Sequence, residues 1–148
     1  MTGAIGTPLV VDTSVAVKWF FHEPRSEQAV AILEACRAGR QELMVPDLIY
    51  PEFANAVRKR VLRDGLAPED GSTIVAAFRR LPFETVIASR TLWPAAYRLA
   101  LEYGCTVYDA VFIVTASQMG ADCVTADEEL YRAVAEHVAG FRCLGVSK

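Results

Sequence analysis

The chain has 148 residues, of which 53% are hydrophobic, and its 15 basic and 18 acidic residues give a net charge of −3. This length predicts one domain spanning residues 1–148 with a substantial core, and no apolar run is long enough for a transmembrane helix. The start, Met1–Ile5, lacks the basic and apolar segments of a signal peptide, so we expect a cytoplasmic protein. The four cysteines form no CxxC pair, which favours buried free thiols over a zinc or thioredoxin-like site.

Short apolar runs alternate with longer helical patterns in the first half of the chain. The predicted elements are, in order, a strand at 9–11, helices at 13–21 and 24–38, a strand at 42–45 and a helix at 47–63. Asp47 is the expected N-cap of the last of these helices, and Gly65 is its expected stop.

The same alternation continues in the second half. The predicted elements are a helix at 68–81, a strand at 83–87, helices at 89–103 and 108–119, a strand at 123–125, a helix at 127–137 and a strand at 141–144. Ser89 is the expected cap of the helix that it begins. Strands that alternate with helices predict an α/β fold with a mainly parallel central sheet.

Four acidic residues interrupt apolar runs far apart in the chain. They are Asp12, Glu52, Asp109 and Asp127. An isolated ionised carboxylate in apolar surroundings costs on the order of several kcal/mol unless something compensates for it. A bound divalent cation would compensate for several carboxylates at once. A ligand set made only of oxygens indicates Mg²⁺ or Mn²⁺, and therefore phosphoryl chemistry.

The predicted elements favour a shared location for three of these acids. Asp12 and Asp127 each follow a strand run, and ligands of open α/β sheets lie beyond the carboxyl ends of strands. Asp109 shares a helical stripe with Phe112 and Ile113, three and four residues later. Helix capping is the simpler alternative for each acid alone, but the recurrence favours one common site.

Glu52 lies on the predicted helix at 47–63. Asn55, one turn later, can orient the glutamate, and the simpler alternative is a surface ion pair with Lys59, seven residues away. If the four acids form one site, the rest of the chain carries 15 basic and 14 acidic residues, because 18 − 4 = 14. Basic stripes at Arg58–Arg60 with Arg63 and at Arg79–Arg80 could then contact a nucleic acid, although they could equally be solvated helix faces.

Other catalytic motifs are absent from the sequence, whereas one family resemblance extends over residues 9 to about 130. The chain has no GxxxxGK[ST], GxGxxG, HExxH or GxSxG motif. Four segments, in order, resemble a PIN domain, and more narrowly the VapC toxins of toxin–antitoxin pairs: Val10–Trp19, Pro46–Ala56, Tyr108–Ala110 and Val124–Asp127.

The resemblance implies a three-layer α/β/α sandwich and a Mg²⁺-dependent endoribonuclease, with Mn²⁺ as a possible substitute, that acts as a toxin on RNA. It also implies a small antitoxin protein that covers the site, and the apolar composition is compatible with a homodimer. A housekeeping RNA-processing or DNA nuclease of the same fold, or a catalytically silent binding module, is the alternative. We expect the aromatic side chains of Trp19, Phe20, Phe21 and Trp93 in the core, with a protein interface as the alternative.

The same resemblance implies roles for individual residues. All four acids match the acidic cluster of the family. Of these, we expect Asp12 and Asp109 to bind the metal directly, and Glu52 and Asp127 to bind it directly, through water, or to orient the nucleophile. The resemblance adds three supporting polar residues: Ser14, Asn55 and Thr125. It assigns no motif to the segment from Gly65 to Tyr103.

Overall fold

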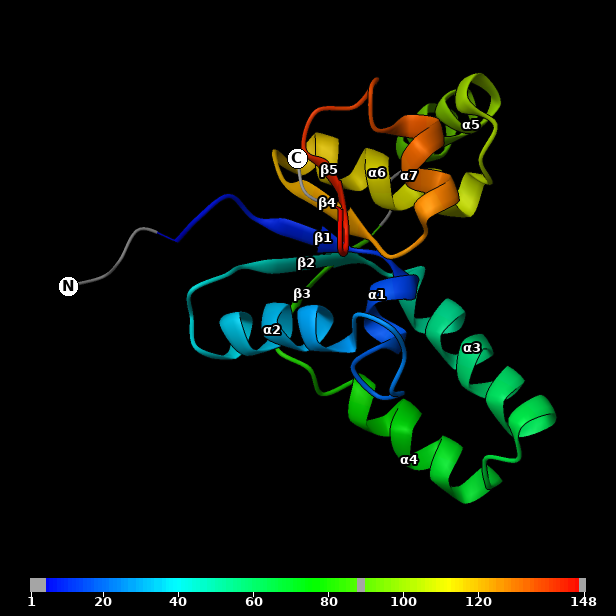
Figure 1. Cartoon of the computed structure of the whole chain (residues 1–148). Coiled ribbons are helices and arrows are strands. Elements are labelled where there is room, and N and C mark those ends of the chain that lie inside the picture. Colours follow the sequence, from blue (N-terminus) through cyan, green and yellow to red (C-terminus); the bar gives the residue numbers. More distant parts are fainter. Residues whose placement is uncertain (1–4, 88–89, 147–148) are drawn as a thin grey trace.

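The computed structural model describes residues 5–87 and 90–146 (Figure 1). Within these ranges the strands are β1 (Leu9–Val11), β2 (Leu43–Pro46), β3 (Glu84–Val86), β4 (Asp122–Thr125) and β5 (Phe141–Cys143). The helices are α1 (Thr13–Val17), α2 (Ser26–Arg37), α3 (Ile49–Asp64), α4 (Pro68–Phe78), α5 (Leu92–Tyr103), α6 (Val107–Met119) and α7 (Glu128–Val134).

The strands form one sheet in the order β3-β2-β1-β4-β5, and every pairing between them is parallel. Leu9 of β1 pairs with Leu43 of β2 on one side and with Asp122 of β4 on the other. All residues of β1 and β2 are buried, as expected for parallel strands covered on both faces. The predicted α/β fold is therefore confirmed.

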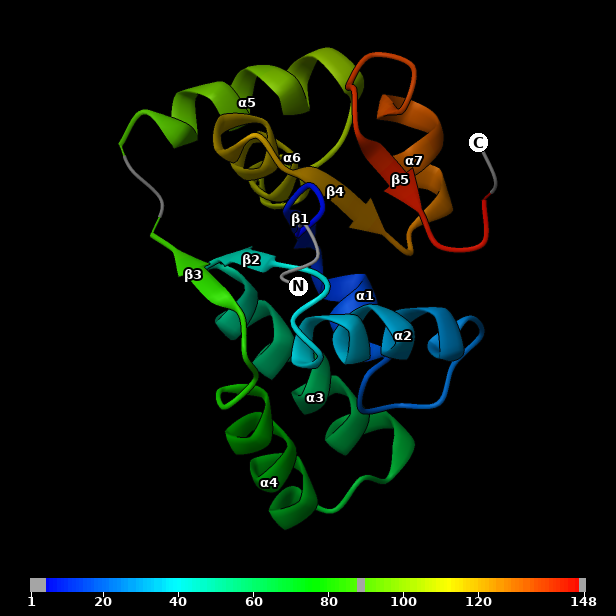
Figure 2. The same cartoon turned by 90° about the vertical axis from the view of Figure 1, so that its left-hand side faces the viewer.

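Helices cover both faces of the sheet. In both views α5, α6 and α7 lie on one side, whereas α2, α3 and α4 lie on the other (Figures 1 and 2). The α1 helix follows β1 at the carboxyl edge of the sheet, and α3 and α4 form a hairpin that extends away from it. This arrangement is the three-layer sandwich that the family resemblance implied.

A stacked aromatic pair fixes the α3–α4 hairpin. The rings of Phe53 in α3 and Phe78 in α4 have centroids 3.9 Å apart at an interplanar angle of 11°, and both residues are fully buried. Gly71 of α4 lets the two helices approach, because a Cβ atom there would lie 3.1 Å from Val61 Cγ2. Truncation of a buried phenylalanine to alanine typically costs about 3–5 kcal/mol, so this packing strongly stabilises the helix that carries Glu52.

On the opposite face of the sheet, α6 packs beneath α5. Every residue from Ala110 to Ala116 in α6 is buried, which leaves α5 as the exposed layer above it. Among the described residues, no single helix has the length and apolar composition of a membrane span. The α5 and α6 helices meet that standard only together, across a bend of 116°.

Several helix boundaries differ from the prediction: α1, α4 and α7 end three or four residues early, and α2 begins two residues late. The first helix ends at Val17 instead of residue 21, and the chain continues through tight turns to Phe20. The second begins at Ser26 instead of Pro24, because Arg25 has a left-handed φ of 67°. The Arg25 guanidinium donates to the Leu144 carbonyl at 2.8 Å and pairs with Glu128 at 2.8 Å.

The predicted cap of the third helix is wrong. That helix begins at Ile49, and its N-cap residue, Leu48, has no side-chain capping bond. The backbone N–H of Asp47 instead donates to the carbonyl of Val86 at 3.0 Å, so Asp47 extends the sheet. The predicted cap at Ser89 lies outside the described residues.

The four cysteines are free, as predicted. Cys123 and Cys143 are buried, whereas Cys36 and Cys105 are only partly buried. Burial raises the pKa of the Cys123 thiol well above its ordinary value, which keeps it protonated and unreactive.

Candidate active site

All four predicted acids line one cleft of about 250 Å³. The cleft lies at the carboxyl ends of β1 and β4, where the sheet order changes direction, and residues of α1, α3 and α6 line it. Its lining residues are Asp12, Thr13, Ser14, Glu52, Asn55, Ala56, Lys59, Asp109, Phe112 and Asp127. Four segments that are far apart in the sequence therefore contribute their carboxylates to one place.

Asp12 is the most buried of the four acids, with 7% of its surface exposed. It caps α1, because its Oδ1 atom accepts the Val15 N–H at 3.3 Å, and the same oxygen accepts a hydrogen bond from Ser14 Oγ. Burial raises the pKa of Asp12 from 3.8 to about 6, against the opposing effect of hydrogen bonds from Ser14 and Thr125. Asp12 therefore caps α1, and burial disfavours the ionised form of its carboxyl group.

Two hydroxyl groups connect Asp12 to the loop after β4. Ser14 Oγ accepts the Ala126 N–H at 2.8 Å, and Thr125 Oγ1 accepts the Asp127 N–H at 3.0 Å. The two hydroxyl oxygens lie 3.4 Å apart. Because each hydroxyl already accepts a backbone donor, its own proton is available to the Asp12 carboxylate. Thr125, which is fully buried, thus supports the site without lining the cleft.

Glu52 is half-buried on α3 and is held by Thr13. Thr13 Oγ1 donates to Glu52 Oε1 at 2.6 Å. Burial, and to a lesser extent the nearby Asp109 charge, raise the pKa of Glu52, whereas the Thr13 bond opposes this rise. The sequence reasoning missed Thr13 as a site residue, although its place beside Asp12 was a signal.

Among the described residues, neither Asn55 nor Lys59 forms a hydrogen bond or an ion pair with the Glu52 side chain. The ion pairs there include none between Glu52 and Lys59, so that alternative is wrong. Asn55 lines the cleft beside Glu52 but is exposed, and the described hydrogen bonds include none between the two side chains.

Asp109 lies in the first turn of α6 without capping it. The cap is Thr106, whose Oγ1 accepts the Asp109 N–H at 3.0 Å, so the capping alternative for Asp109 is wrong. Burial raises the pKa of Asp109, and the charge of Asp127 adds to the rise. Asp109 also raises the pKa of both Asp12 and Glu52. Asp109 therefore interacts electrostatically with each of the other three acids.

Asp127 caps α7 through a bond from the Leu130 N–H to its Oδ1 atom at 3.0 Å. It also lines a neighbouring cleft of about 400 Å³, together with Asp109, Glu129 and the loop before α6. Asp109 and Asp127 thus lie on the wall shared by the two clefts. The capping alternative is correct for Asp127 as local structure, and it is compatible with a second role in the cleft.

The donor chemistry of the cleft fits a hard divalent cation. Its lining carries four carboxylates and one ammonium, and burial together with like-charge repulsion raises the pKa of Asp12, Glu52 and Asp109. In the part of the chain that the structure describes, no three Asp, Glu, His or Cys side chains already form a ligand cage. Cation binding would therefore require side-chain rearrangement within the cleft.

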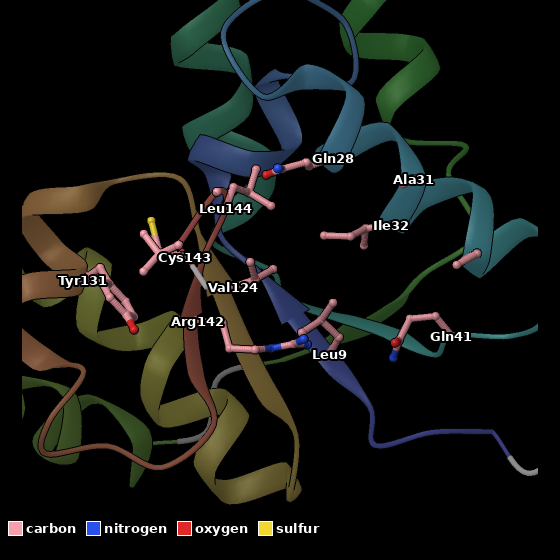
Figure 3. A pocket seen from close by; sticks show the side chains of 13 residues that line it. Leu9, Gln28, Ala31, Ile32, Gln41, Val124, Tyr131, Arg142, Cys143 and Leu144 are labelled. Carbon is pink, nitrogen blue, oxygen red and sulfur yellow. The ribbon is translucent and has the colours of Figure 1, made fainter. Parts of the chain in front are cut away.

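A different cavity, of about 520 Å³, lies on the α2 side of the sheet (Figure 3). Apolar side chains such as Ile32 and Leu144 line most of it, and Arg142 is a charged exception. The Arg142 Nε atom lies 3.7 Å from Asp122 Oδ2. Because none of the described residues that line this cavity is acidic, the carboxylate cleft is the candidate active site even though it is smaller.

Comparison with known proteins agrees with this assignment of the fold. The model of the family described as PIN domain matches residues 9–136. The chain belongs to the PIN-domain family. A related protein, Ribonuclease VapC3 of Pyrobaculum aerophilum, is 33% identical over 126 residues, which are 82% of this chain and 91% of that protein. The chain is thus a PIN-domain ribonuclease of the VapC type.

Solved structures show the same PIN fold. Pyrobaculum aerophilum PAE2754 superimposes with a TM-score of 0.67 at 22% sequence identity, covering 97% of this chain and 88% of that one. A toxin–antitoxin complex from Klebsiella pneumoniae contains a chain that matches with a TM-score of 0.60 at 15% identity, over 90% of this chain and 94% of that chain. At these identities the structural matches establish the PIN fold alone.

Proposed function

We propose that this PIN-domain ribonuclease is the toxin of a toxin–antitoxin pair and hydrolyses RNA phosphodiester bonds in the carboxylate cleft with Mg²⁺, for which Mn²⁺ can substitute. The observation that carries the proposal is the convergence of Asp12, Glu52, Asp109 and Asp127 on one cleft. When bound, a divalent cation lowers the pKa of water and offsets negative charge on a phosphate. Residues 1–148 would act as one cytoplasmic nuclease domain.

The residues divide the work according to their positions. Asp12 and Asp109 would bind the cation directly, and Glu52 and Asp127 would bind it directly, through water, or orient the attacking water. Ser14 and Thr125 would fix Asp12 through hydrogen bonds, and Asn55 would add a polar amide to the wall of the cleft. Burial of Asp12 supports its role, because a cation would offset the charge that burial disfavours.

Cleavage of defined RNAs tests this function. The purified protein should cleave a member of a tRNA, rRNA and mRNA panel with Mg²⁺ or Mn²⁺, and sequencing of the new ends should reveal a preferred site. Chelation of the cation, or Asp109→Asn, should abolish cleavage. Cleavage that survives Asp109→Asn would rule out the proposed site, and cleavage of DNA but not RNA would favour a housekeeping nuclease. Failure to bind Mg²⁺ or Mn²⁺ at millimolar concentration would favour a silent binding module.

An antitoxin is the proposed protein partner. The Klebsiella pneumoniae neighbour was solved as a toxin–antitoxin complex, which supports the same kind of partner here. The four carboxylates would pair with a basic side chain that the antitoxin inserts, and such charge-assisted bonds are among the stronger polar contacts. Co-expression with the protein encoded by a small reading frame next to this gene should therefore suppress RNA cleavage, if that protein is the antitoxin. An unrelated basic peptide at equal concentration should not.

We also propose a homodimer, based on an exposed apolar row on α5. Trp93, Tyr97 and Leu101 follow one another at intervals of four residues, and their exposed fractions are 41%, 58% and 72%. The core position expected for Trp93 is thus wrong, which makes this surface available for a second copy. Light scattering should give twice the mass of the chain for the wild type and the single mass for Leu101→Glu. An unchanged mass for that variant would place the interface elsewhere.

A further inference from the structure

Three consecutive basic residues of α3, Arg58, Lys59 and Arg60, lie in three different environments, although the sequence groups them as one stripe. Arg60 pairs with Glu23 and with Asp64 at 3.4 Å, and its guanidinium lies 4.8 Å from the ring centroid of Phe21. The positive charge of Arg60 is therefore already matched by two carboxylates within the fold.

Arg58 and Lys59 lie on different sides of the same helix. Arg58 lines a mostly apolar groove of about 870 Å³ between α3 and α4. Lys59 lines the carboxylate cleft and is exposed, and the ion pairs of the described chain include none that involves it. Of the described residues that line that cleft, Lys59 is the single cation.

We propose that Lys59 is a substrate-positioning residue that binds an RNA phosphate next to the one that is cleaved. This inference rests on the proposed ribonuclease function of the cleft. Lys59 follows Glu52 by seven residues on the same side of α3, which places the two Cα atoms about 10 Å apart along the helix axis. A phosphate on the cation at the acids and a neighbouring phosphate on Lys59 would then occupy opposite ends of one cleft.

The charges on the two sides of the acids are unequal, which gives the bound strand a direction. The neighbouring cleft beyond Asp109 and Asp127 contains Glu129, and its described lining residues include no Lys or Arg. A phosphate on that side would meet like charge, whereas a phosphate on the α3 side would meet Lys59. The strand is therefore held by its phosphate on the α3 side.

Steady-state cleavage by matched variants tests this role. Lys59→Ala should raise KM about tenfold and leave kcat within about twofold, because a lost phosphate contact weakens ground-state and transition-state binding alike. The dependence of log(kcat/KM) on log salt concentration should become shallower by roughly one. Lys59→Arg should restore the wild-type KM, since it keeps the charge. Arg58→Ala, one position away but facing the other groove, should match the wild type.

RNA truncation tests the direction. Shortening a cleavable RNA from one end should remove the KM difference between wild type and Lys59→Ala, and shortening from the other end should leave it. Equal sensitivity in both series would overturn the one-sided arrangement. A Lys59→Ala enzyme with the KM and salt dependence of Arg58→Ala would overturn the phosphate contact.

Binding without cleavage separates this inference from the proposed function. In an Asp109→Asn background, labelled RNA should bind about tenfold more weakly when Lys59→Ala is added. If the wild type cleaves no RNA but Lys59→Ala still weakens RNA binding, the role of Lys59 is upheld while the nuclease proposal fails. Cleavage by the wild type with no effect of Lys59→Ala in either assay would overturn the Lys59 proposal alone.

Discussion

At the scale of single residues, Asp109 experiences the charges of all three other acids in the cleft. It raises the pKa of Asp12 and of Glu52, and Asp127 raises its own. Its carboxylate does not cap α6, because Thr106 does. Hydrogen bonds with Thr106 favour the ionised form of Asp109, but burial outweighs them and the charge of Asp127 adds to the rise in its pKa, so the fold does not gain from this charge.

Removing that charge should therefore cost activity but not stability. We expect Asp109→Asn to leave the metal-free unfolding free energy at pH 7 unchanged or raised, because it relieves repulsion and burial of charge. Urea unfolding in the presence of a chelator measures this. A loss of several kcal/mol would instead identify Asp109 as a structural residue.

Thr13 should control the ionisation of Glu52. Thr13→Val removes the 2.6 Å bond that opposes the raised pKa of Glu52, so this pKa should rise further and the acidic limb of the pH–rate profile should move to higher pH. Activity near pH 6 should fall about 10–100-fold, as is typical when a ligand loses its supporting hydrogen bond. Thr13→Ser keeps the hydroxyl and should keep the profile. An unmoved limb in Thr13→Val would mean that Glu52 does not govern it.

At the scale of elements, α7 depends on Asp127 for its start. Because Asn caps helices about as well as Asp, Asp127→Asn should keep the stability of the fold and lose RNA cleavage. Asp127→Ala should lose both cleavage and about 1 kcal/mol of stability. Thermal unfolding and a cleavage assay on both variants separate the two roles. Full activity in Asp127→Asn would leave Asp127 as a cap only.

The elements also show which features local patterns determine. The strands and most helices were predictable from apolar patterns: a repeat at helical spacing indicates α2, and a short continuous apolar run indicates β1. Helix starts show the limit of local patterns: α3 begins one residue too late for Asp47 to be its N-cap, whereas α6 begins directly after Thr106, which caps it. The start of α2 depends on contacts of Arg25 with Leu144 and Glu128, more than 100 positions away.

At the scale of the whole molecule, the sheet order brings the acids together. Alternation of strands and helices predicted that Asp12 and Asp127 share an edge, but the adjacency of β1 and β4 follows only from the fold. The bond between Thr13 and Glu52 joins residues 39 positions apart and was invisible to helical offsets. The sequence therefore identified the four acids together with Ser14 and Thr125. It did not identify Thr13 as the partner of Glu52, or Lys59 as the cation of the cleft.

Stability of the whole fold should fall as pH rises when no cation is bound. The unfolded Asp12 carboxyl ionises near 3.8 and the folded one near 6, so the folded state binds more protons between these values. This group alone should lower the unfolding free energy by up to about 3 kcal/mol between pH 4 and pH 7. Chemical unfolding across this range in chelator measures the slope, and Asp12→Asn should flatten it. A millimolar divalent cation should raise stability most at pH 7, and a cation effect that is largest at pH 4 would contradict the assignment.

The hydrogen bonds through Ser14 and Thr125 divide the cleft into two mechanically different halves. The Asp12 side chain and the backbone at Asp127 are joined across neighbouring strand ends, so folding already fixes their separation. Glu52 and Asp109 come from helices on opposite sides of the sheet and share no hydrogen bond with that network in the described chain. Arrival of a cation should therefore leave the strand-end half in place and draw the helix-borne half toward it. Spectroscopic probes on α3 and α6 would then report binding, whereas probes on β1 and β4 would remain silent.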